Sequence, residues 1–162
     1  RQHSPHEADR VVEAWVDVAQ RRGELVTGST AAKAHIIVEE SALTREVGGP
    51  EVLAGQLDAL VSAVTGNQDL TFRVLPFSAG YIQQMRTSFA AVWFEGSGPA
   101  DLFHVDITPT EKSPFKTGIR TVENDQQLAD YERALNQLNG LALDEDATLE
   151  LVERARADLP VG

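Results

Sequence analysis

Apolar positions recur with a helical period after Gly48-Gly49-Pro50. Glycines interrupt regular structure, and the fixed φ of proline suits the first turn of a helix. Spacings of three and four residues place the apolar side chains on one face and predict a helix over Pro50–Val64. Those apolar positions are Leu53, Leu57, Leu60, Val61 and Val64. Gly66-Asn67 tolerates a left-handed C-terminal cap and is expected to end this helix.

The period changes from helix to strand after residue 69. Leu70, Phe72 and Val74 alternate with polar residues, which predicts a strand over Leu70–Leu75. Pro76 lacks a backbone donor and should end the strand pairing. Ser78-Ala79-Gly80 then predicts a turn.

A second β-rich run, Ala34–Val38, precedes this helix and has apolar residues on both faces, as a central strand does. Ser41–Thr44 is compatible with one helical turn. Together with the helix and strand that follow, the run predicts a β-α-β unit.

Two further strands are predicted over Phe89–Phe94 and Leu102–Ile107, separated by Gly96-Ser97-Gly98-Pro99. A connection this short favours an antiparallel hairpin. Thr108–Gly118 contains two prolines and is expected to be an exposed loop.

Helices are predicted at both ends of the chain. Ser4-Pro5-His6-Glu7 is a capping-box pattern that begins the first helix, which is expected to end before Gly23. Because the chain opens almost directly on this cap, we expect further sequence upstream. A helix from about Glu123 should close at Gly140, and Asp144 should cap a last helix. The apolar stripes of these two helices are Leu128, Tyr131, Leu135 and Leu138, then Leu151, Val152, Ala155 and Leu159.

These elements predict an α+β fold in a single domain over residues 1–162. Its mixed, mostly antiparallel sheet of about four strands would be flanked by the N-terminal helix, one crossover helix and two C-terminal helices. The strands over Leu70–Leu75 and Phe89–Phe94 are expected to be sheet neighbours.

Composition narrows the class of protein. The 162 residues are 42% hydrophobic, enough for a sizeable core, and no apolar run is long enough to cross a bilayer. There are no cysteines, so an intracellular, cytoplasmic location is expected by default. A net charge of −11 repels phosphate backbones, which predicts no direct contact with nucleic acid.

Two separated segments carry a family resemblance. LTREVGGPEVLAGQLDAL at 43–60 and TFRVLPFSAG at 71–80 are similar to the paired signatures of the DUF5753 domain, and DYERALNQLNGLALDEDATLELV follows in that domain's order. The resemblance runs from about Arg10 to Leu159. It implies the C-terminal domain of an actinobacterial helix-turn-helix regulator, often encoded beside a small partner protein.

This chain departs from the family pattern in three places. The helix-turn-helix and its bridging segment do not occur in it. Tyr81–Arg86 (YIQQMR) replaces a Gly/Pro-rich stretch, and His104-Val105-Asp106 stands where an acidic tripeptide is frequent.

Three local patterns are candidates for chemical sites. His104 and Asp106 alternate along one strand and could be a general base with its orienter or two metal ligands; a polar sheet face is the favoured interpretation. His35 and Glu39 do not form a site, because the strand ends near Val38, and His35 is interpreted as a packed or edge residue. Gly48-Gly49-Pro50 could hold an anion on its amides, although a structural helix start is favoured. No metal site and no cofactor are predicted.

Aromatic residues gather in one part of the chain, and core packing would explain most of them. A pocket beneath the Tyr81–Arg86 connector would explain the rest, with the sheet face that lines it left open. The predicted ligand-binding residues are Phe77, Tyr81, Met85, Arg86, Trp93 and His104.

Two classes of function remain open. The favoured hypothesis is a non-catalytic regulatory domain that binds a small molecule or a small partner protein, with a homodimer possible and no membrane contact. The alternative is a small biosynthetic enzyme recruited from the same scaffold, which would use the aromatic pocket with His104 and Asp106.

Overall fold

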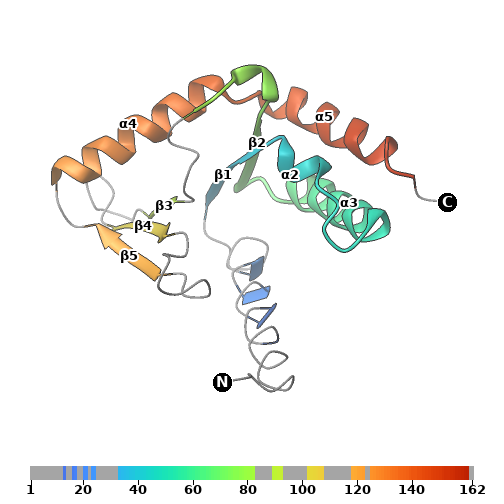
Figure 1. The fold of residues 1–162 in the computed structure, drawn as a ribbon, viewed down its shortest axis with the longest axis horizontal. Coiled ribbons are helices and arrows are strands. Elements are labelled where there is room, and N and C mark those ends of the chain that lie inside the picture. Colours follow the sequence, from blue (N-terminus) through green and yellow to red (C-terminus); the bar gives the residue numbers. More distant parts are fainter. Residues whose placement is uncertain are drawn as a thin grey trace, which may run out of the picture. The chain divides into compact units, whose positions relative to one another are not determined.

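The computed structural model describes residues 33–82, 89–92, 102–107, 118–122 and 125–160, together with residues 13, 16, 17, 20, 21, 23 and 24 (Figure 1). For residues 92, 102–107, 118–122 and 125 it describes the backbone alone. The chain divides into two compact units. The first unit comprises Arg1–Val74 and Leu143–Gly162, and the second comprises Leu75–Ala142.

The described residues near the N-terminus are helical and exposed, as expected for the polar face of the predicted first helix. The predicted end before Gly23 is wrong, because Gly23 and Glu24 are also helical. The cap pattern at residues 4–7 lies outside the described residues.

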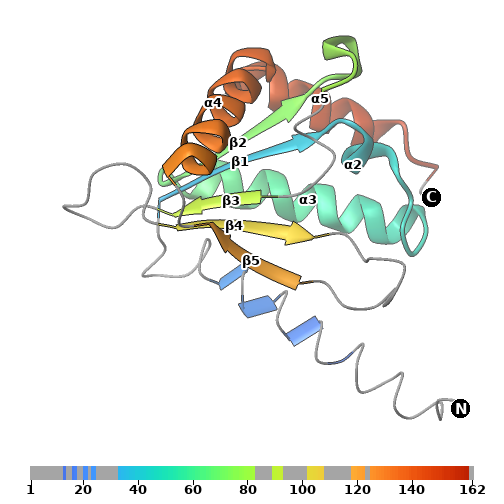
Figure 2. The same cartoon turned by 60° about the vertical axis from the view of Figure 1, so that its left-hand side comes forward.

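The β-α-β prediction is confirmed in the first unit. β1 (Ala34–Glu39) leads through α2 (Ser41–Thr44) into α3 (Pro50–Gly66), and β2 (Leu70–Leu75) follows. The two strands pair in parallel and run in the same direction in Figure 2, and the amide of Ala34 donates to the carbonyl of Asp69 over 2.8 Å at their start. β2 buries Leu70, Phe72 and Val74, which confirms the strand predicted from their alternation with polar residues.

α3 begins at Pro50 and ends at the predicted Gly66-Asn67 stop, but the conformation of the cap differs from the expected one. Gly48 and Gly49 have φ of 86° and 99°, and Pro50 occupies the first turn. The predicted left-handed cap at Gly66-Asn67 is wrong, because Asn67 is extended with φ −132°. Its Oδ1 instead accepts from the amide of Asp69 (3.0 Å), so an Asn-based turn reverses the chain into β2.

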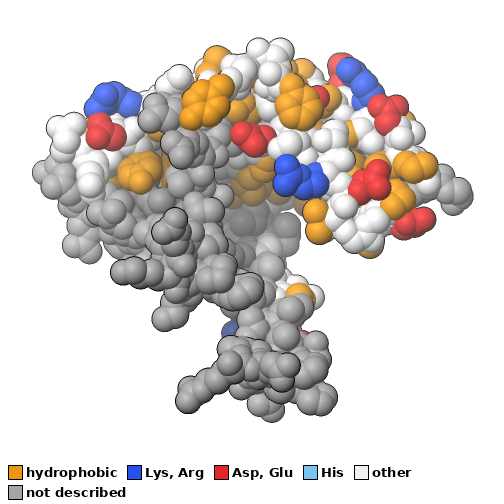
Figure 3. Space-filling model, viewed as in Figure 1, with side chains coloured by type: hydrophobic (Ala, Val, Ile, Leu, Met, Phe, Trp, Pro, Cys, Tyr) orange, Lys and Arg blue, Asp and Glu red, His pale blue; other side chains and the backbone are white. Residues whose placement is uncertain are grey.

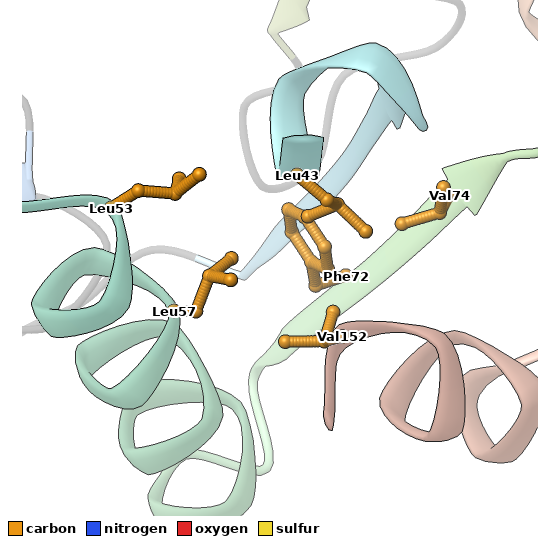
Figure 4. Close-up of a cluster of buried hydrophobic side chains, with 6 residues drawn as sticks. All are labelled: Leu43, Leu53, Leu57, Phe72, Val74 and Val152. Carbon is orange, nitrogen blue, oxygen red and sulfur yellow. The ribbon is translucent and has the colours of Figure 1, made fainter. Parts of the chain in front are cut away.

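α5 (Glu145–Ala157) completes the core of the first unit, and Figure 4 shows how its Val152 lies against side chains of α2, α3 and β2. The cap prediction is confirmed, since Asp144 Oδ1 accepts from the amide of Ala147 over 2.8 Å. Arg156 Nε donates to Asp58 Oδ1 over 3.0 Å and ties α5 to α3. The buried cluster is Leu43, Leu53, Leu57, Phe72, Val74 and Val152.

The second unit contains an antiparallel sheet and a helix. β3 (Phe89–Val92) pairs with β4 (Leu102–Ile107), which confirms the hairpin, and β4 pairs with β5 (Gly118–Val122). α4 (Asp125–Leu141) follows and buries Ala134 and Leu138. The predicted close at Gly140 is wrong, because the helix runs through this glycine without a positive φ.

The expected mixture of helices and strands is confirmed, but the expected single sheet of about four strands is wrong. The described strands form a two-stranded sheet, β1-β2, and a three-stranded sheet, β3-β4-β5, so β2 and β3 belong to different sheets. β5 takes the edge position beside β4, and its Ile119, Thr121 and Val122 are β-branched. The expectation of one domain over residues 1–162 stays a prediction.

Candidate functional site

The candidate site is the turn between β2 and the Tyr81–Arg86 connector, which belongs to the second unit. Pro76 is extended and leads into the short 3₁₀ helix η1 (Phe77–Ala79). The amide of Ala79 donates to the carbonyl of Pro76 (2.9 Å), and that of Gly80 donates to Phe77 (3.1 Å). Gly80 then has φ 73° and ψ −159°, a conformation that side chains with a Cβ rarely adopt. The turn therefore has a defined backbone.

Two aromatic side chains on this turn face solvent. Phe77 is 63% exposed and Tyr81 is 80% exposed, whereas the flanking aliphatic residues Leu75 and Ile82 are buried. The buried side chains of Leu75 and Ile82 anchor both ends of the segment. The rings are therefore exposed because the backbone of the turn directs them to solvent. Exposed aromatic rings of this kind suit recognition of a ligand or a protein surface.

The structure describes only some of the residues predicted to line the pocket. Phe77 and Tyr81 lie on the turn, four residues apart. Met85, Arg86 and Trp93 lie outside the described residues, so their place in the site stays a prediction.

His104 and Asp106 occupy alternate positions on β4, the central strand of the antiparallel sheet. The Cα of His104 is partnered by Ala90 on β3 and by Thr121 on β5, and Asp106 is partnered by Ile119. Their side chains are outside the described part of the structure. The general-base and metal-ligand hypotheses for this pair therefore stay hypotheses.

Phe89 packs against α4. Its ring centroid lies 5.4 Å from that of Tyr131 with an interplanar angle of 47°, a tilted stack. Ala91 and Leu128 belong to the same apolar contact. This aromatic residue therefore supports the second unit, as the packing interpretation of the aromatic cluster expected.

His35 lies on β1 and is exposed, which agrees with the edge interpretation of this residue. Partial burial, and then the positive charge of Arg73, lower the pKa of His35 below its ordinary value, while the Glu145 carboxylate opposes the shift. These three residues come from β1, β2 and α5. Because they are far apart in sequence, no local spacing could have predicted their association. His35 is therefore an edge residue whose pKa responds to the charges of Arg73 and Glu145.

The glycine-rich start of α3 has a structural role. An added Cβ on Gly49 would lie 3.6 Å from the Glu51 Oε2 carboxylate oxygen, so a negative side chain already stands beside the positive end of the helix dipole. This arrangement favours the structural interpretation over an anion site. In Figure 3, acidic and basic side chains are interspersed with apolar ones over α2, α3 and α5.

The described residues offer neither a metal centre nor a membrane span. These residues contain no group of three or more His, Cys, Asp or Glu side chains placed to hold an ion. None of the helices described here has the length and apolar character to span a bilayer.

Comparison with known proteins identifies one family. The family model described as "Domain of unknown function (DUF5753)" matches residues 1–154, which include described parts of both compact units. No curated protein and no solved structure matches the chain.

Proposed function

Because the chain belongs to the DUF5753 family, we propose that it is a non-catalytic regulatory domain of a transcriptional regulator that binds a small molecule or a small partner protein. The binding surface is the segment Phe77–Tyr81, and the regulator's DNA contacts belong to another part of the protein. A net charge of −11 supports this division, since an acidic surface repels the phosphate backbone.

The exposure of Phe77 and Tyr81 is the observation that carries the proposal. Isolated exposed apolar residues are ordinary, but here two aromatic rings flank one turn whose backbone is fixed by hydrogen bonds. Rigid aromatic side chains lose little conformational entropy on binding, which makes them effective anchors. The turn follows directly from Leu75, the buried last residue of β2, which anchors its start.

The regulatory response of the host strain tests the proposal. Transcript levels are compared between the wild type, a deletion of the gene, and strains in which the gene carries Phe77→Ala or Tyr81→Ala. Both variants should fold, since removing an exposed side chain changes stability by about 0.5 kcal/mol or less. We expect both to reproduce most of the deletion's transcript changes.

The matched control is Val47→Ala, which shortens another exposed apolar side chain (68% exposed) in the first unit. This strain should keep the wild-type transcript pattern. Wild-type transcripts in both aromatic variants would overturn the proposed surface. If His104→Ala and Asp106→Ala instead abolished a product of the host strain while transcripts stayed normal, the enzyme hypothesis would replace the regulatory one.

A further inference from the structure

The chain passes between its two compact units twice, after Val74 and after Ala142. Val74 and Leu143 are the residues at these crossings that belong to the first unit. They are joined directly, because the amide of Leu143 donates to the carbonyl of Val74 over 2.8 Å. Two chain segments that are remote in sequence are thereby held side by side within the first unit.

Two side chains complete this connection. Arg73 Nε donates to the carbonyl of Leu143 over 2.6 Å, and the amide of Val74 donates to Thr148 Oγ1 over 3.2 Å. The amide and the carbonyl of both crossing residues are therefore hydrogen-bonded. We call this network of Arg73, Val74, Leu143 and Thr148 the clasp.

Burial makes the clasp costly to open. Val74 is fully buried and Thr148 is 1% exposed, so water does not readily replace the bond between the Val74 amide and the threonine hydroxyl. A buried amide that loses its hydrogen-bond partner is no longer compensated for its removal from water. The free-energy cost of this loss exceeds the net contribution of an ordinary hydrogen bond to stability. Breaking the bond between the Val74 amide and Thr148 therefore leaves a buried donor without an acceptor.

We propose that the clasp is a coupling device, which makes both crossings respond together when the Leu75–Ala142 unit changes conformation. α5 would receive that response, because it begins two residues after Leu143 and is capped by Asp144. Val152 in the core and the Arg156–Asp58 ion pair then connect α5 to α3. The inference is independent of what binds the Phe77–Tyr81 turn, since it rests on bonds inside the first unit.

Closure of the outer edge of β2 is the simpler explanation for the same bonds. Edge closure predicts that loss of the Thr148 hydroxyl accelerates amide exchange at Val74 and Leu143 alone. Coupling predicts an additional effect beyond the crossings, on amides that belong to the second unit. Suitable reporters are the amides of Ala79, Gly80 and Ala142, which donate to the carbonyls of Pro76, Phe77 and Leu138.

Amide hydrogen exchange of the whole chain under native conditions separates the two explanations. Thr148→Val removes the hydroxyl and keeps the shape of the side chain. Exchange at Val74 and Leu143 should become about five- to tenfold faster, as expected for the loss of one buried hydrogen bond. The coupling proposal requires a similar acceleration at Ala79, Gly80 and Ala142.

The matched control is Thr65→Val, which removes the exposed hydroxyl that donates to the carbonyl of Val61 within α3 (2.8 Å). Exchange at the two crossing amides, Val74 and Leu143, and at the three reporter amides should stay within about twofold of the wild-type rates, as expected for an exposed surface position. Thr148→Ser, which keeps the hydroxyl, should retain slow exchange at the reporters in the second unit relative to Thr148→Val.

A second variant keeps the test decisive if Thr148→Val does not fold. Arg73→Met removes the guanidinium bond to Leu143 and retains the unbranched stem on the half-buried face of β2. It should accelerate exchange at Leu143 and at Ala142 together. Faster exchange at Val74 and Leu143 with wild-type rates at Ala79, Gly80 and Ala142 would overturn the proposal and leave edge closure as the explanation.

Discussion

Val152→Ala provides the sharpest test of the packing in the first unit. Val152 has no exposed surface and lies in the cluster that joins α5 to α2, α3 and β2 (Figure 4). The substitution removes two methyl groups and introduces alanine, which has a higher helix propensity than valine. Any loss of stability therefore reports packing, because the helix itself is not weakened.

The expected magnitude follows from burial. Two fully buried methyl groups contribute about 1.6 kcal/mol at about 0.8 kcal/mol each. The cluster comes from four elements, which cannot all move to fill the space, so a cavity term adds to this value. We expect a total loss of about 2–3 kcal/mol in the free energy of unfolding.

Urea unfolding followed by far-ultraviolet circular dichroism measures this loss. Val47→Ala is the matched control, since the same two methyl groups are removed from a side chain that is 68% exposed. The control should differ from wild type by about 0.5 kcal/mol or less. If Val152→Ala were no more destabilising than Val47→Ala, α5 would not close this core and the packing account would be refuted.

Three further predictions concern charge and capping. Because the pKa of His35 is lowered by burial and by Arg73, the unfolded chain takes up this proton first as pH falls. His35 should therefore leave the stability unchanged above its ordinary pKa of about 6.5. Stability should decline as the pH falls from there through the lowered pKa of the folded state, and His35→Gln should flatten this part of the stability–pH curve. Asp144→Ala should cost about 1 kcal/mol in urea unfolding by removing the cap on the Ala147 amide, whereas Asp144→Asn, which keeps an acceptor, should cost less than half of that. Fluorescence anisotropy with a labelled DNA duplex should detect no salt-sensitive affinity near physiological ionic strength; micromolar binding that weakens steeply with added salt would contradict the charge argument.

Local patterns predicted the elements of the first unit well. The apolar stripe after Pro50 and the alternation at Leu70–Leu75 each reflect burial of one face, and burial dominates the choice of secondary structure. Asp144 was predictable as a cap because its side chain bonds an amide only three residues away. Such short-range causes leave a direct trace in the sequence.

Strand pairing was harder to predict because it joins remote segments. Nothing in the period of Leu70–Leu75 states whether its neighbour is β1 or β3, and the order β1-β2 separate from β3-β4-β5 emerged only from the structure. β5 was missed because the prolines before it directed attention to a loop, although Ile119, Thr121 and Val122 favour a strand. α4 ends at Leu141 rather than at Gly140, because a glycine without a positive φ does not by itself end a helix.

The candidate site shows a similar limit. Phe77 and Tyr81 could be selected from the sequence as aromatic residues near a predicted turn, but their exposure depends on which way that turn faces. The association of His35 with Arg73 and Glu145 required three elements to meet in space. Neither property has a signature in residue spacing.

We propose the aromatic rings of the Phe77–Tyr81 turn as the recognition surface of a regulatory domain. The most direct test compares Tyr81→Phe with Tyr81→Ala in the host strain, with transcript levels as the measurement. Tyr81 is 80% exposed, so neither change should disturb folding. Tyr81→Phe should keep most of the wild-type response because the ring remains. Tyr81→Ala should give the transcript pattern of the gene deletion. A wild-type response from folded Tyr81→Ala protein would contradict the claim.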